Sequence, residues 1–87
     1  MASAPGTGRT AVTYYVALPF VRTDDGDLGA GEAKETQSSD AARREAARMA
    51  LGTAGAVVFS RTGDLGTGEF EEAKVLATYG EDGSLLA

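Results

Sequence analysis

The chain has 87 residues with 13 acidic and 8 basic side chains, which give a formal net charge of −5. It contains neither cysteine nor histidine. This excludes disulfides, zinc and iron–sulfur sites of the usual ligand types, and catalysis by a serine–histidine or cysteine–histidine pair. The acidic balance argues against non-specific binding to nucleic acid, and no segment has the ~18 consecutive apolar residues of a membrane span.

A chain of this length predicts one domain with a small hydrophobic core. Residues 1–10 are small and polar and predict a flexible N-terminal tail, without the apolar segment of a secretory signal. Residues 11–80 are expected to form a single α+β domain, and residues 81–87 a short acidic tail. The lack of cysteine and of a signal fits a cytoplasmic protein.

The first strand is predicted over residues 13–22, which are rich in aromatic and β-branched side chains. Both alternating sets of this segment are apolar, so a strand formed by it needs cover on both faces. Pro19 lacks a backbone N–H and therefore predicts an edge position or a bulge. Residues 32–37 alternate in polarity only weakly and predict a mostly polar return strand.

A glycine-rich string occurs twice, in residues 22–32 and 61–69. When Asp24 and Asp25 are removed from the first copy, the two strings differ only at Ala30 and Thr67. Glycine supplies the positive φ angles that tight hairpin turns need. The repeat therefore predicts two structurally equivalent hairpins.

Between the two copies, Ser38 or Ser39 is expected to cap a helix that runs to about Leu51 and ends at Gly52 in a left-handed conformation. The helix presents one apolar face at 3.6-residue spacing, made of Ala42, Ala46, Met49, Ala50 and Thr53. Residues 55–59 predict the third strand. Residues 69–79 predict the last, with a bulge near residues 71–72.

This order of elements predicts an α+β fold of ββαββ type, in which a four-stranded, largely antiparallel sheet carries one helix on one face. One helix leaves the other face of the sheet uncovered. An uncovered apolar face of several hundred Å² is unusual on a monomer and marks an interaction surface. The candidates for this surface are Tyr15, Val21, Val58, Val75 and Tyr79. We therefore expect a non-enzymatic protein-interaction module that self-associates, as a homodimer, or binds an unidentified protein.

The alternative is a small-ligand or cation-binding protein that uses the two turns. The turn candidates are Arg22, Asp27, Glu32, Arg61, Asp64 and Glu69. The interpretation that we favour is a cross-strand ion pair between the arginine and the glutamate of each copy, which helps to set strand register. The acidic residues fail the spacing of an EF-hand, the glycines are not those of a P-loop, and no catalytic set is present. No metal and no cofactor are predicted.

The segments Gly55-Ala-Val-Val-Phe-Ser-Arg-Thr-Gly-Asp64, Gly68-Glu-Phe-Glu-Glu-Ala-Lys-Val-Leu-Ala-Thr-Tyr-Gly80 and Tyr14-Tyr-Val-Ala-Leu-Pro-Phe20 resemble a family of small uncharacterised bacterial proteins. The resemblance covers about residues 13–80. It implies a bacterial, cytoplasmic protein of unknown function, and no functional residue carries over from it.

Overall fold

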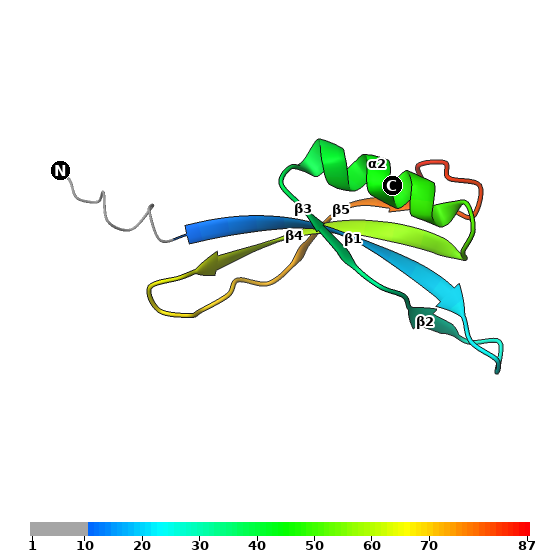
Figure 1. Ribbon diagram of the computed structural model, residues 1–87, viewed down its shortest axis with the longest axis horizontal. Helices are drawn as coiled ribbons and strands as arrows, with labels where there is room; N and C mark the ends of the chain where they lie inside the picture. Colours follow the sequence, from blue (N-terminus) through cyan, green and yellow to red (C-terminus); the bar gives the residue numbers. More distant parts are fainter. Residues whose placement is uncertain (1–10) are drawn as a thin grey trace.

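The computed structural model describes residues 11–87, which form one helix and a five-stranded antiparallel sheet (Figure 1). The elements are β1 (Ala11–Arg22), β2 (Leu28–Ala30), β3 (Lys34–Thr36), α2 (Ser39–Ala50), β4 (Gly55–Asp64) and β5 (Lys74–Tyr79). β2 and β3 both pair with β1, β1 pairs with β4, and β4 pairs with β5. The predicted α+β class is confirmed, and the tail expected at residues 1–10 lies outside the described part.

The sheet has five strands instead of the predicted four because the return strand is divided into β2 and β3. β2 pairs with Phe20–Arg22 and β3 with Tyr15–Ala17, so the break falls opposite Pro19. Pro19 has no N–H to give to a neighbouring strand, and its carbonyl oxygen accepts from the N–H of Gly31 at 2.8 Å. The proline therefore marks a break in the partner strand, while β1 itself lies inside the sheet.

β1 and β4 form the longest pairing, which runs without a shift from Ala11 opposite Asp64 to Phe20 opposite Gly55. β4 therefore continues well past the apolar run that predicted it. The first part of β1 and the last part of β4 extend as a two-stranded arm beyond the end of α2 (Figure 1).

β5 is shorter than predicted, since it begins at Lys74 and not at Glu69. The preceding residues form an irregular connection, in which Phe70 forms an isolated β-bridge with Gly63 of β4. A register shift beside Val58 and Phe59 places the bulge at Leu76, so the bulge predicted near residues 71–72 is wrong. Residues 71 and 72 are Glu71 and Glu72. Both are exposed and lie outside any strand, so their charges stay hydrated.

The helix begins as predicted, because the Ser38 hydroxyl oxygen accepts from the backbone N–H of Ala41 at 3.1 Å. Its end differs from the prediction. Leu51 is the C-cap in a right-handed conformation, and Gly52 is not among the glycines with positive φ. The Thr53 hydroxyl instead donates to the carbonyl oxygen of Met49 at 2.9 Å, which satisfies one of the last helical carbonyls without a left-handed residue.

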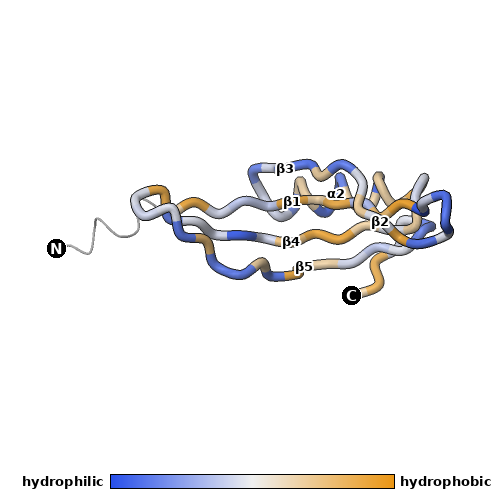
Figure 2. Tube along the Cα trace, turned by 90° about the horizontal axis from the view of Figure 1, so that it is seen from below, coloured by the Kyte–Doolittle hydropathy of each residue, from blue (hydrophilic) through white to orange (hydrophobic). Residues whose placement is uncertain are grey.

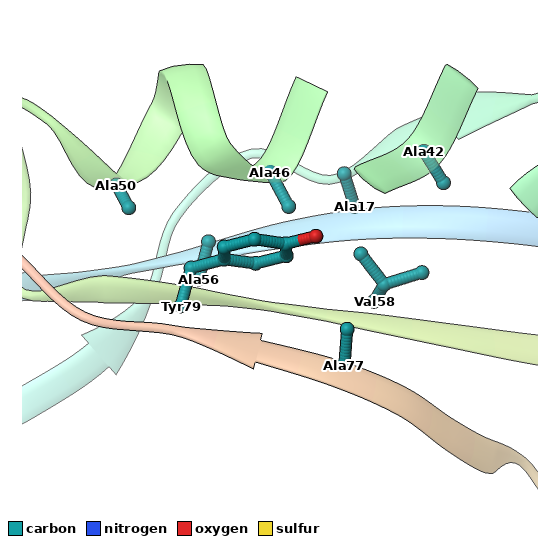
Figure 3. Packing of buried hydrophobic residues seen from close by; sticks show 8 residues of the cluster. All are labelled: Ala17, Ala42, Ala46, Ala50, Ala56, Val58, Ala77 and Tyr79. Atoms are coloured by element: carbon teal, nitrogen blue, oxygen red, sulfur yellow. The ribbon is translucent and has the colours of Figure 1, made fainter. Parts of the chain in front are cut away.

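The core lies between α2 and the sheet and is built mostly from alanine (Figure 3). Its buried members are Ala17, Ala42, Ala46, Ala50, Ala56, Val58, Ala77 and Tyr79. Small side chains on both surfaces let the helix backbone approach the sheet closely. The same small side chains bury little apolar area, so this contact contributes less to stability than a core of leucine or phenylalanine.

An exposed ion cluster joins β3 to α2. Lys34 Nζ lies 3.4 Å from Glu45 Oε2, and Arg48 pairs with the other oxygen of the same carboxylate. The hydrogen bond from Arg48, aided by the one from Lys34, holds the pKa of Glu45 below its ordinary value. Exposed pairs of this kind stabilise a fold only slightly, so the cluster mainly orients β3 against the helix.

The segment expected as an acidic tail turns back along β5. The N–H of Leu86 donates to the carbonyl oxygen of Thr78 at 2.7 Å, and the N–H of Thr78 donates to the carbonyl oxygen of Ala87 at 2.9 Å. Asp82 stabilises the turn by accepting from the N–H and the hydroxyl of Ser84, and these hydrogen bonds lower the pKa of Asp82. This end of the chain therefore adds hydrogen bonds to the outer edge of the sheet.

Replacing Ser38 with alanine is expected to lower the free energy of unfolding by about 1 kcal/mol, because the first turn of α2 loses its side-chain acceptor. Urea unfolding followed by far-ultraviolet circular dichroism measures the change. The control is Ser39→Ala, which removes a neighbouring hydroxyl that does not cap the helix. Equal losses in the two variants would contradict the capping role of Ser38.

Candidate functional site

The candidate site is the face of the sheet opposite α2, which we call the open face. In Figure 1 the helix lies on one side of the strands, and no described segment covers the central part of the other side. Figure 2 views the molecule from that other side, with β1, β4 and β5 in front of the helix. The hydrophobic stretches of β1 and β4 lie side by side there.

Strand register decides which residues share this face. Ala17 of β1 lies opposite Val58 of β4, and both are fully buried under the helix. Because successive strand residues point to opposite faces, their neighbours point to the open face. The apolar centre of the open face is formed by Val16, Leu18, Phe20, Val57, Phe59 and Val75.

Apart from Tyr79, the buried core consists of smaller apolar side chains than the open face does. Under the helix the largest fully buried side chain among the described residues is Val58, and most of its neighbours are alanines. On the open face two phenylalanines and a leucine stand beside three valines. Val75 is 68% exposed, and the others are half-buried because they pack against one another across the strands. The sheet therefore turns its more hydrophobic side toward solvent.

Charged groups lie only at the margins of this face, and Arg22 is one of them, because it lies two residues beyond Phe20 at the end of β1. Register places Glu35 of β3 beside Val16, and Arg61 of β4 beside Tyr14. The Arg61 guanidinium lies 5.4 Å from the centroid of the Phe70 ring, a cation–π distance. The ring itself covers the backbone of Gly63, so closely that a side chain there would collide with it.

Four of the five residues predicted for the interaction surface lie on the other face. Val58 and Tyr79 are core residues, and Tyr15 packs against the same core. Val21 lies four residues after Ala17 on β1 and therefore points to the same face as Ala17. Of the five, only Val75 lies on the open face. The prediction assigned these residues to the wrong face of the sheet, because both faces of these strands are apolar. The alternating alanines at positions 17, 56 and 77 were the available signal, since they match the alanine face of the helix.

The six turn candidates do not form one site. The first turn follows Arg22 at one end of β1, while Asp64 pairs with Ala11 at the other end. The predicted arginine–glutamate ion pairs are also absent from residues 11–87. The Arg22 guanidinium donates to the carbonyl oxygen of Gly26 at 3.1 Å. Arg61 lies over Phe70, and Glu32 and Glu69 are exposed.

The two turns are not structurally equivalent, although their sequences repeat. In the first copy the turn comes before the shared leucine, and Gly26 supplies the positive φ of 87°. In the second copy the glycine at the matching position, Gly63, is still within β4, and Gly68 supplies the positive φ of 80°. The Asp64 carboxylate accepts from the N–H groups of Gly66 and Thr67, whereas the turn contacts of Asp27 use its backbone carbonyl.

Two shallow clefts lie at opposite ends of the β1–β4 pair, away from the centre of the open face. One, of about 300 Å³, is lined by Val21, Arg22, Gly52, Thr53, Ala54 and Glu81. The other, of about 240 Å³, is lined by Thr62, Gly63, Asp64, Glu69, Phe70 and Glu71. In residues 11–87 no group of three acidic side chains has a metal-binding arrangement, and no helix there is long and apolar enough to span a membrane.

Comparisons with protein-family models, with curated proteins and with solved structures find no match to this chain.

Proposed function

We propose that this chain is a small, non-enzymatic protein-interaction module that self-associates. The observation that carries the proposal is the open face, where Phe20, Phe59 and Leu18 lie on a sheet surface that no described element covers. Monomeric proteins rarely leave a contiguous apolar patch larger than a few hundred Å² in water. Covering such a patch releases free energy of roughly 25 cal/mol per Å² of apolar surface, which favours association.

The charge of the chain supports a protein partner over nucleic acid. The net charge is −5, and a phosphate backbone attracts proteins with basic surfaces. The open face has Arg61 and Glu35 at its margins and apolar side chains at its centre. This distribution resembles a protein interface, in which the centre is depleted of charge and the rim is polar. A cytoplasmic location is part of the same proposal.

Light scattering across a concentration series tests self-association. We expect the mass to rise from that of one chain, 8.9 kDa, to twice that value as the concentration increases. The physical reason is mass action on a face whose burial is favourable. A mass that stays at one chain up to millimolar concentration would contradict self-association.

A calcium titration of the same samples, followed by amide chemical shifts, tests the alternative of cation binding. It would move the signals of the two turns only if that alternative holds.

A further inference from the structure

We propose that the open face is covered by a second copy of this chain, packed sheet against sheet. The inference rests on the self-association proposed above and adds the surface and the geometry. In the resulting dimer the two sheets form the middle layers and the two α2 helices the outer layers. The alternatives are association through strand edges and a face that serves a different protein.

The distribution of side-chain size is the first argument. α2 covers the face with the small residues, Ala17, Ala56 and Ala77, and leaves the face with the large ones. A sheet needs a packed layer against each apolar face. Each of two identical chains has one uncovered apolar face, so a single contact with two-fold symmetry covers both faces. Closed two-fold dimers are the commonest solution of this kind among homo-oligomers.

The extent of the open face is the second argument. Four strands lie side by side only from Tyr15 to Phe20, a region about 20 Å long at a rise of about 3.3 Å per residue and about 19 Å wide at a spacing of about 4.8 Å. The two-stranded ends, residues 12–14 and 21–22, add about 150 Å². The face therefore covers about 530 Å² in each copy, and two copies would bury about 1,100 Å², just above the roughly 1,000 Å² that a specific interface is expected to exceed.

The position of the charges is the third argument. Glu35 lies on the β3 side of the face and Arg61 on the β4 side. A two-fold axis parallel to the strands, between β1 and β4, carries Arg61 of each copy over Tyr14 of the other, one strand and two residues away from Glu35. Opposite charges therefore approach at the rim. The centre around Leu18 and Phe59 contains no charge that burial would leave unpaired.

Three variants with the same change in charge test the surface. Phe59→Glu places a carboxylate at the centre of the open face, and Val75→Glu places one near its edge. Leu65→Glu is the control, because Leu65 is 64% exposed in the second turn and lies outside the open face. Light scattering gives the mass, and urea unfolding at several protein concentrations gives the midpoint. Circular dichroism confirms that each variant is folded. If Phe59→Glu does not fold, Val75→Glu provides the answer, because residue 75 is exposed.

We expect the wild type and Leu65→Glu to form dimers whose unfolding midpoint rises with protein concentration. Phe59→Glu should raise the dissociation constant by at least about 30-fold, as expected for a residue at the centre of an interface. Val75→Glu should raise it by a smaller factor. If both open-face variants dimerise as tightly as the wild type, the inference is wrong while self-association stands. If the wild type is monomeric at every concentration, both fail.

Discussion

Replacing Gly55 with alanine is expected to lower the free energy of unfolding by about 2–4 kcal/mol. Gly55 begins β4 with a φ of +143°, a conformation that side-chain-bearing residues rarely adopt. An added Cβ would lie 2.8 Å from the carbonyl oxygen of Tyr79. That oxygen is backbone on the neighbouring strand, so relief requires β4 and β5 to separate.

The control for this substitution is Gly52→Ala, a few residues earlier in the chain. An added Cβ at Gly52 meets no atom within 4 Å, and its φ is not positive. Its effect should stay within about 0.5 kcal/mol. Urea unfolding of both variants at one protein concentration measures the difference. A Gly55→Ala variant as stable as Gly52→Ala would mean that β4 and β5 do not approach as described.

The second large loss of unfolding free energy is expected on substitution of Val58. The matched control is the adjacent valine, Val57. Val58 is fully buried under the helix, whereas Val57 points to the open face. Val58→Ala removes two methyl groups from the core and should cost about 2 kcal/mol at any protein concentration. Under dilute conditions Val57→Ala should cost less than about 1 kcal/mol, since its side chain is half-exposed there.

The two valines also distinguish the faces when the protein is concentrated. If two open faces pack together, the cost of Val57→Ala rises with protein concentration, because the deleted methyl groups then come from a buried interface. The cost of Val58→Ala does not change. The measurement is the unfolding free energy of both variants across the concentration series. Equal costs under dilute conditions would show that the helix does not select the Val58 face.

Local features of the chain were predictable because neighbouring residues determine them. The helix start at Ser38 follows from a hydroxyl that accepts from a first-turn N–H. The helix face of Ala42, Ala46 and Ala50 follows from 3.6-residue periodicity. The α+β class follows from the order of these elements. Each of these depends on residues a few positions apart.

The turns show where local reasoning fails. Nearly identical strings adopt different structures at the two ends of β1, because pairing with β1 continues β4 through Gly63 to Asp64. The Phe70 ring then covers Gly63, and the turn moves to residues 65–68. The expected ion pairs are lost as well, because Arg22 lies opposite Leu28 and not Glu32, and Arg61 lies over Phe70.

The amino-acid pattern is enough to predict the class of fold, the helix with its alanine face, and the need to cover two apolar sides of the strands. The side that the helix covers depends on how α2 packs against the assembled sheet. Strands that are apolar on both faces leave that choice open. The packing of side chains decides which face α2 covers, because the alanines of α2 pack closely against the face of Ala17, Ala56 and Ala77. That packing leaves the larger side chains, Phe20 and Phe59 among them, on the open face.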